Sequence, residues 1–298
     1  MIHISRIRAL GLLILAAVCP GTALALSTTP DKPQNVSISL GAEFASGKYG
    51  TDTTTRSVYM PLITTWSPND RFDIGIEIPV LYQSNSNVTT DLYRNGQQSS
   101  TAATTVAKGG PGGSGMGLQQ QGAGGPGGAT STGTSSSAVT GLGDIILRLG
   151  VIAHAEDKTM PQLRPSLYIK FPTASKNDGL GTGEFDAGAG IELTKWLGDY
   201  HLTGEGVYVW QGKADGFSLK NYFCYTGGIG YQLTEKLEPM VLVKGATAPS
   251  DYSGELLEVR ARLIWTITSA TSLDMYGSRD IADSSPDYGG GIAVIYSF

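Results

Sequence analysis

Apolar and polar residues alternate with a period of two through most of the chain after residue 34. Such alternation is typical of β-strands that have one face in an apolar environment. Twelve runs show it, at 36–44, 58–66, 72–82, 145–151, 163–171, 185–193, 202–210, 223–231, 237–243, 257–267, 273–275 and 292–298. The pattern predicts an all-β protein of about twelve strands.

The connections between these runs alternate in length. Short turns are expected at 67–70, 154–161, 197–199, 232–236 and 268–271, and longer or Gly/Ser-rich loops at 46–55, 83–140, 172–183, 211–218, 246–254 and 280–287. An even number of strands of about ten residues, with short turns at one end and long loops at the other, is the pattern of an outer-membrane barrel. We therefore expect a transmembrane antiparallel up-and-down β-barrel with one long disordered extracellular loop.

The distribution of charge supports a barrel, but it does not exclude a soluble β-sandwich, which also keeps charges on one face. Aromatic placement separates the two folds, because a membrane barrel carries rings at both lipid–water interfaces. Rings near the short turns predict a membrane girdle of Trp66, Trp196, Tyr231, Trp265, Tyr296 and Phe298. Prolines at positions 61 and 79 count against a regular ladder and leave the strand register around them open.

The faces opposite the apolar ones are rich in acidic, basic and tyrosine residues. The candidates for lining the lumen are Asp73, Glu77, Asp144, Arg148, Arg164, Tyr168, Lys170, Glu192, Glu205, Tyr222, Arg260 and Arg262. One interpretation is that these groups pair across strands and plug a narrow interior. The other is that they line an aqueous path that selects solutes by charge and size.

The first 25 residues have the pattern of a secretory signal peptide. A basic segment with Arg6 and Arg8 precedes an apolar stretch at 9–18, and Ala23-Leu24-Ala25 forms a small-x-small cleavage site. The expected domains are a signal peptide at 1–25 and a barrel at 26–298. The formal net charge of −5 makes nucleic acid an unexpected partner.

The loop at 83–140 contains the tract "GGPGGSGMGLQQQGAGGPGG". It is an extracellular lid or contact surface on one interpretation and a disordered insertion on the other. The second is favoured, because so few apolar residues cannot offset the entropy cost of ordering. Gly110, Gly112 and Gly115 match the spacing of a dinucleotide fingerprint, but no helix follows them.

Nothing in the sequence indicates catalysis, a cofactor or a metal. Beyond the leader the chain has two histidines, His154 in a short turn and His201 on an inward face, and neither is expected on lipid-facing surface beside a serine. Two histidines also make a His-rich metal site implausible. The expectation is that the protein is not an enzyme.

Four segments carry a family resemblance: "GLGD" at 141–144, "KFPTA" at 170–174, "GLGTGEFD" at 179–186 and "LTKWLGDYHLTGEGVYVW" at 193–210. With them, residues 35–298 resemble the MetA-pathway phenol degradation proteins, a set of outer-membrane barrels often described as transporters. The resemblance implies a channel role that includes uptake of aromatic or hydrophobic compounds. It supplies no catalytic residues, and the Gly-rich loop departs from the family pattern.

These observations predict a bacterial outer-membrane channel for passive uptake of small solutes, including aromatic or hydrophobic compounds. The alternative is a plugged barrel that displays the Gly-rich loop as an interaction surface. The expected partners are the lipid bilayer, small-molecule solutes and the outer-membrane assembly machinery. The final strand, "GIAVIYSF", ends on Phe298, and a terminal aromatic residue resembles the signal presented to that machinery.

Overall fold

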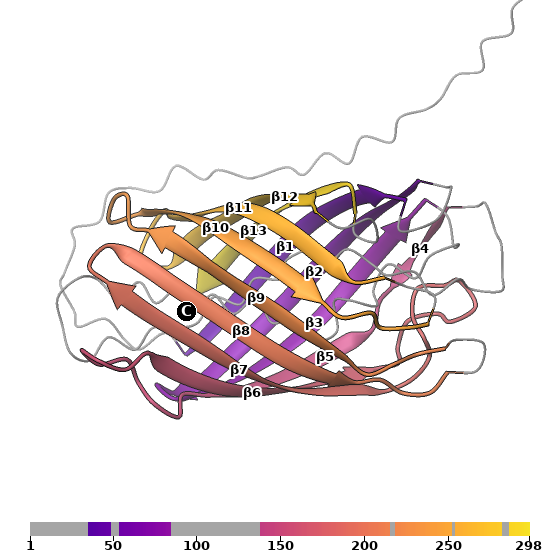
Figure 1. Ribbon diagram of the computed structural model, residues 1–298, viewed down its shortest axis with the longest axis horizontal. Coiled ribbons are helices and arrows are strands. Elements are labelled where there is room, and N and C mark those ends of the chain that lie inside the picture. The colour runs from indigo at the N-terminus through magenta and orange to yellow at the C-terminus, as the bar shows by residue number, and fades with distance from the viewer. Residues whose placement is uncertain (1–34, 49–53, 85–137, 215–217, 252–253, 282–285) are drawn as a thin grey trace, which may run out of the picture. The chain divides into compact units, whose positions relative to one another are not determined.

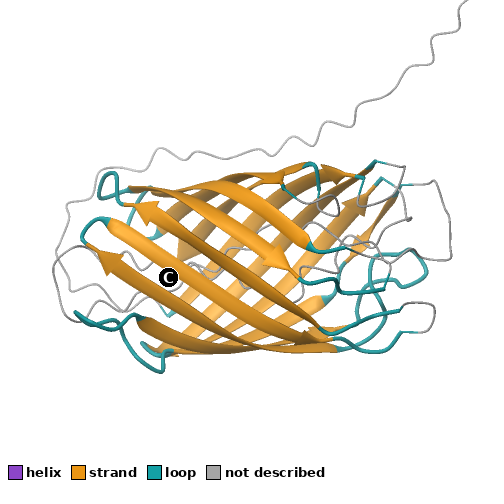
Figure 2. Cartoon of the chain, viewed as in Figure 1, coloured by secondary structure: helices purple, strands orange, loops and turns teal. Residues whose placement is uncertain are grey.

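The computed structural model describes residues 35–48, 54–84, 138–214, 218–251, 254–281 and 286–298. Thirteen strands are assigned in this part of the chain (Figures 1 and 2). They are β1 (Val36–Gly47), β2 (Thr55–Asn69), β3 (Phe72–Gln83), β4 (Val139–Leu142), β5 (Ile145–Val151), β6 (Gln162–Phe171), β7 (Asp186–Leu197), β8 (Tyr200–Trp210), β9 (Tyr222–Tyr231), β10 (Leu237–Ala246), β11 (Leu256–Thr266), β12 (Thr271–Asp280) and β13 (Tyr288–Ser297). No described residue belongs to a helix long and apolar enough to cross a membrane.

The sheet closes on itself. Apart from β4 and β5, strands that are consecutive in sequence pair antiparallel, and β1 pairs with β13. The β2–β3 pairing joins the remaining edges. Strands β4 and β5 both pair with β3 and together occupy the position of a single strand in the barrel, so the thirteen assigned strands fill twelve positions. The prediction of a twelve-stranded up-and-down barrel is therefore confirmed.

The connections differ between the two ends of the barrel, as predicted. At the turn end, β7 and β8 are joined by two residues. One of them, Gly198, has a positive φ of 63°, which residues with a side chain rarely adopt. The proposed signal peptide at 1–25 and most of the loop predicted at 83–140 lie outside the described residues. The strands extend into that loop range, because β3 runs to Gln83 and β4 begins at Val139.

The two prolines that interrupt the pattern face each other. Pro61 on β2 is directly opposite Pro79 on β3, and both side chains are on the inward face. Pro61 has no N–H, and the β1–β2 ladder loses its pairing at Gly41 and Ala42. The ladder resumes with Glu43, so the loss is local.

Pro79 is accommodated by a β-bulge. Between the pairs Val80↔Leu142 and Glu77↔Ile146, the β4–β5 strand carries one more residue than β3. The Gly143 amide donates to the Pro79 carbonyl at 2.9 Å. A Cβ on Gly143 would lie 2.1 Å from Leu81 Cδ1, so a side chain there would force the buried Leu81 side chain to move. The extra residue turns Asp144 into the lumen, where it is buried.

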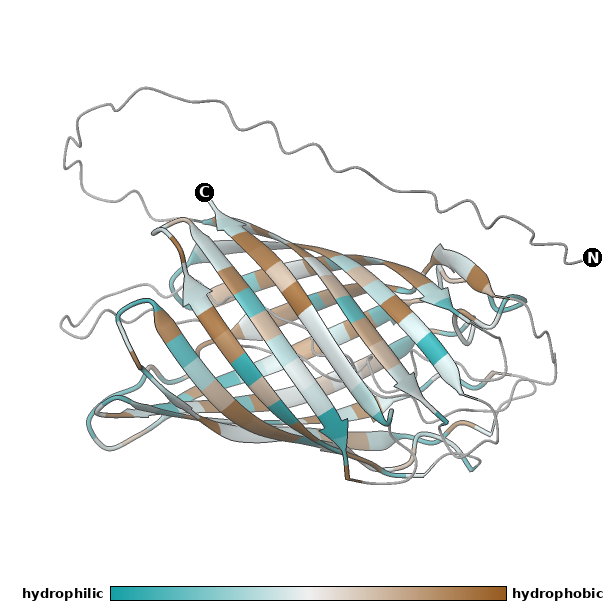
Figure 3. Ribbon diagram, turned by 90° about the horizontal axis from the view of Figure 1, so that it is seen from above, coloured by the Kyte–Doolittle hydropathy of each residue, from teal (hydrophilic) through white to brown (hydrophobic). Residues whose placement is uncertain are grey.

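The burial pattern is inverted relative to a soluble protein. Large apolar residues are exposed on the outer face, as Leu40 (62%) and Val241 (54%) illustrate, whereas charged residues such as Glu77 (1%) and Lys170 (1%) are buried inside. Figure 3 shows hydrophobic residues recurring along the strands with more polar ones between them. A charge at the lipid midplane costs about 2–4 kcal/mol, so this arrangement is what a membrane-spanning barrel requires.

Candidate functional site: the barrel lumen

All twelve predicted lumen residues have the inward orientation in their strands or in the bulge. Ten are buried, and Asp73 and Glu205 are half-buried. Cross-strand register brings most of them into three groups of paired side chains. The basic residues among them lie within ion-pair distance of acids.

The first group lies near the loop end. The ammonium of Lys170 is 2.9 Å from Asp144 Oδ2 and 2.9 Å from Asp186 Oδ2. It also donates to the Thr182 hydroxyl, at 3.1 Å. Asp144 in turn accepts a hydrogen bond from the Ala174 amide at 2.9 Å. Lys170 therefore links a carboxylate of the bulge and one of β7 to the β6–β7 loop.

That loop, at 172–185, folds against the inner wall. Leu180 (2% exposed) and Ala174 (7%) form a small buried cluster with Tyr59 and Leu81. The Gln83 amide donates to the Gly179 carbonyl at 3.3 Å. This contact could not be predicted from the sequence, because the loop contains few apolar residues and Leu180 resembles an isolated one.

The second group occupies the wall from β2 to β7. Arg164 donates to both Asp73 carboxylate oxygens and lies 3.1 Å from Glu192 Oε2. Arg148 lies 2.6 Å from Glu77 Oε2, and the Tyr59 hydroxyl donates to Glu77. Bidentate guanidinium–carboxylate pairs of this kind fix geometry as well as charge.

The third group lies across β10, β11, β12 and β1. Arg260 donates to Glu258 and also stacks over the Tyr276 ring, 4.8 Å from its centroid. The Tyr276 hydroxyl donates to Glu43 Oε2 at 3.1 Å. Arg262 forms a bidentate pair with Asp274. The Lys244 ammonium lies 3.9 Å from Glu258 Oε1.

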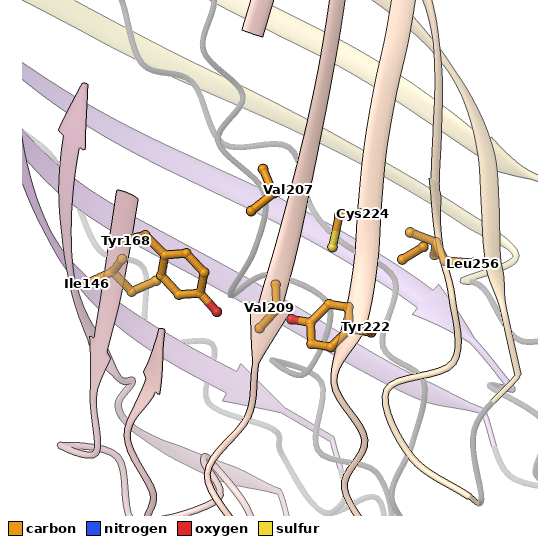
Figure 4. Close-up of a cluster of buried hydrophobic side chains, with 8 residues drawn as sticks. Ile146, Tyr168, Val207, Val209, Tyr222, Cys224 and Leu256 are labelled. Atoms are coloured by element: carbon orange, nitrogen blue, oxygen red, sulfur yellow. The ribbon is translucent and has the colours of Figure 1, made fainter. Parts of the chain in front are cut away.

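An apolar cluster interrupts the charged lining, and we call it the luminal apolar cluster. Its members are Ile146, Tyr168, Val207, Val209, Tyr222, Cys224, Ala246 and Leu256. In Figure 4 the Tyr168 and Tyr222 hydroxyl groups point toward each other, with Val209 between them. The lumen thus combines apolar surface and phenolic hydroxyls with surrounding charges.

At the turn end, Trp196 departs from the prediction that placed it in the lipid girdle. It shares the inward parity of Glu192 on β7 and lies opposite His201 in the β7–β8 register. The two rings stack with centroids 4.4 Å apart and planes 8° apart. His201 Nδ1 is 2.6 Å from Glu238 Oε1. The parity of β7, once its register is known, puts Trp196 inside.

The other five predicted girdle residues are on the outward face near the turn end. Trp66, Tyr231, Trp265, Tyr296 and Phe298 are between 39% and 59% exposed. The Tyr200–Tyr231 and Tyr296–Phe298 ring pairs lie among them, and Tyr208–Trp210 and Phe223–Tyr225 pairs lie on the outer face near the loop end. Aromatic rings at both ends of the apolar band are typical of the two membrane interfaces.

The β5–β6 turn has its own polar structure. Asp157 Oδ1 accepts hydrogen bonds from the Met160 and Thr159 amides, both at 2.8 Å. These bonds hold the pKa of the Asp157 carboxyl well below its usual value. Lys195 donates to the Asp157 carbonyl and lies 3.2 Å from Glu156 Oε1, which fastens the turn to β7.

Within the described residues, no three His, Cys, Asp or Glu side chains are grouped so that they could hold a metal ion. His154 lies in the β5–β6 turn, 3.3 Å from Asp157 Oδ2.

Solved outer-membrane barrels are similar to this chain, and one of them, with a TM-score above 0.5, supports the fold. An outer membrane channel from Pseudomonas putida F1 aligns with a TM-score of 0.62 and 12% identity, over 93% of this chain and 100% of that chain. The CymD monoaromatic hydrocarbon channel has a TM-score of 0.44 and 10% identity, over 89% of each chain. The Ralstonia pickettii toluene transporter TbuX has a TM-score of 0.44 and 10% identity, over 89% of this chain and 90% of that chain.

A comparison with curated proteins gave no match. The closed barrel, with its apolar outer band and aromatic girdles, is a bacterial outer-membrane protein. A protein-family comparison matches residues 109–298, which is more than half of the chain. The protein therefore belongs to the family described as "Putative MetA-pathway of phenol degradation".

Proposed function

We propose that the protein is a passive outer-membrane channel for small solutes, including aromatic and other apolar compounds, which pass through the lumen of the barrel. The observation that carries this proposal is the luminal apolar cluster, which places Tyr168 and Tyr222 among the charged side chains of the inner wall. Charged groups favour water inside the lumen, and the cluster offers apolar solutes a surface on the way through it.

The arrangement requires no cofactor or energy source, because such a solute would follow its own concentration gradient. The related fold from Pseudomonas putida F1 is named an outer membrane channel, which supports the same role here. The family description refers to phenol degradation, and a phenol-sized solute combines a ring with a hydroxyl group. Tyr168 and Tyr222 present both kinds of surface toward the lumen.

A second candidate is a barrel that is closed at rest. Ion pairs join neighbouring strands around the wall, and the β6–β7 loop is fastened inward by Lys170 and Leu180. These contacts favour a narrow lumen that the loop obstructs. The two candidates differ in whether solutes pass without displacement of that loop.

Single-channel recording in planar bilayers tests the proposal. Purified, folded wild-type protein should conduct, and Leu180→Ser should raise the open probability or conductance because it loosens the loop. Val243→Ser, which changes an outward residue, is the matched control and should leave conductance unchanged. A folded barrel that never conducts, in either the wild type or Leu180→Ser, would contradict the channel proposal.

We also propose that the C-terminal strand is recognised by the outer-membrane assembly machinery. Phe298 is 59% exposed, and its amide donates to the Val36 carbonyl at 2.8 Å, beside the β1–β13 closure. Deletion of Phe298 should lower the outer-membrane level of the protein severalfold, as measured by heat-modifiable migration of membrane fractions. Phe223→Ala, an aromatic change on another strand, should reduce it less. Normal levels of the truncated protein would contradict this role.

A further inference from the structure

The inner wall carries more acid than base. On the inward faces of the described strands and the bulge, the acids are Glu43, Asp73, Glu77, Asp144, Asp186, Glu192, Glu205, Glu238, Glu258, Asp274 and Asp280. The bases are Arg148, Arg164, Lys170, Lys244, Arg260 and Arg262. In a low-dielectric wall such an imbalance focuses a negative potential into the lumen. The interior therefore favours cations and neutral solutes over anions.

Glu205 is an inward carboxylate of this wall that has another acid beside it. It lies directly opposite Glu192 in the β7–β8 register, so two carboxylates face the lumen side by side. Glu192 shares Arg164 with Asp73, at 3.1 Å and 2.6 Å respectively. Glu205 Oε1 is buried and has no hydrogen-bond partner among the described residues.

Arg164, Arg148 and Lys244 are near enough to attract the Glu205 carboxylate. Each of them also lies beside another acid, and Lys244 is 3.9 Å from Glu258 Oε1. Arg148 lies 2.6 Å from Glu77, and Arg164 serves Asp73 and Glu192. A carboxyl oxygen accepts hydrogen bonds, and leaving one without a donor in a buried position is costly. A cationic donor that enters the lumen would fill this position.

The luminal apolar cluster begins next to Glu205 on the same strand face. Val207 and Val209 follow it at two-residue steps, and Val207 lies directly opposite Cys224 on β9. Figure 4 shows Tyr168 reaching toward these valines from β6. A tyrosine ring also attracts ammonium groups, which strengthens the preference for a cation.

We propose that Glu205 and the luminal apolar cluster form one subsite for small amphipathic cations. The ammonium group of an aryl or alkyl amine lies against Glu205, and its apolar part lies against Tyr168, Val207 and Tyr222. This inference rests on the proposed function, because the ligand must enter the lumen, and it adds a charge preference to that function.

Cys224 provides a reporter inside the subsite. The reaction rate of its thiol with a cationic methanethiosulfonate (aminoethyl) is compared with the rate for an anionic one (sulfonatoethyl), each relative to a simple thiol in solution. For the folded wild type, the cation/anion ratio should exceed that of the simple thiol by about tenfold or more. A Cys224→Ala variant corrects for labelling at other positions.

Substitutions distinguish the local effect of the Glu205 charge from the negative potential of the whole lumen. Glu205→Gln keeps the shape and removes the charge, so the ratio should fall by roughly threefold to tenfold. Glu205→Asp should retain most of it. Asp280→Asn removes one inward carboxylate near the loop end of β12 and should change the ratio by less than about twofold. Benzylamine should protect Cys224 in the wild type but not in Glu205→Gln, and benzyl alcohol should protect both equally.

Labelling of the folded barrel tests the subsite, and conductance of the same preparation in bilayers tests the channel. The two proposals can therefore fail independently. Absence of current with a high labelling ratio would contradict the channel and leave the subsite standing. A ratio equal to that of the simple thiol, or equal effects of Glu205→Gln and Asp280→Asn, would overturn the subsite. So would a Cys224 that neither reagent reaches.

Discussion

The outer and inner faces of this barrel are built on the same strands and differ in almost every other respect. On β10, Val241 and Val243 lie exposed on the outside, whereas Leu242 and Lys244 are buried on the inside. The outer face avoids charge, and the inner face gathers charges and pairs them. The difference shows that the apolar side chains of this barrel face the bilayer and not a protein core.

The largest expected effect comes from breaking charge pairing on the inner face. Lys170→Met leaves Asp144 and Asp186 buried without their shared cation, and such changes cost about 3–5 kcal/mol. The free energy of unfolding in lipid vesicles should fall by that amount. The triple variant with Asp144→Asn and Asp186→Asn should recover most of the loss. An unchanged stability of Lys170→Met would show that this group does not hold the inner wall.

The outer face is tested by adding a charge. Val241 is 54% exposed near the middle of β10, and Val241→Arg should destabilise the barrel in vesicles by about 2–4 kcal/mol. Val241→Leu, which keeps the position apolar, is the control and should be nearly neutral. If the arginine variant were as stable as the leucine variant, Val241 would not lie in hydrocarbon.

Trp196 sharpens the comparison because it lies on the inner face although its neighbours in the girdle are outside. In variants that keep one tryptophan each, brominated lipids should quench Trp66 and Trp265 strongly and Trp196 at least about threefold less, because its ring stacks on His201. Steady-state fluorescence measures this. Equal quenching of the three tryptophans would show that Trp196 contacts lipid and would contradict its inward position.

The smallest expected effect is at Asp157, in the turn between β5 and β6. Its folded-state pKa is depressed by the Met160 and Thr159 amides, so its stabilising effect is fully present above its unfolded pKa. The effect is lost as the pH falls from about 4 toward the folded-state value. The stability difference between wild type and Asp157→Asn should be constant above about pH 5 and shrink below pH 4. A difference that is independent of pH would contradict this account.

Periodicity predicted the barrel, its strand number and the orientation of nearly every candidate, because a period of two fixes faces without knowledge of partners. It could not predict which charges pair. The contacts of Lys170 with Asp144 and Asp186 depend on cross-strand register and on a bulge opposite Pro79. The inward position of Leu180 could not be predicted either, because the packing of a loop against distant strands leaves no pattern in the local sequence.

The most direct test of the central claim is uptake of a neutral aromatic solute by cells. Cells that produce the wild-type protein should accumulate radiolabelled benzyl alcohol faster than cells without it. Val207→Trp fills the luminal apolar cluster and should reduce the rate to the background level at equal outer-membrane abundance. Uptake that is the same with wild type, Val207→Trp and no protein would contradict passage through the lumen.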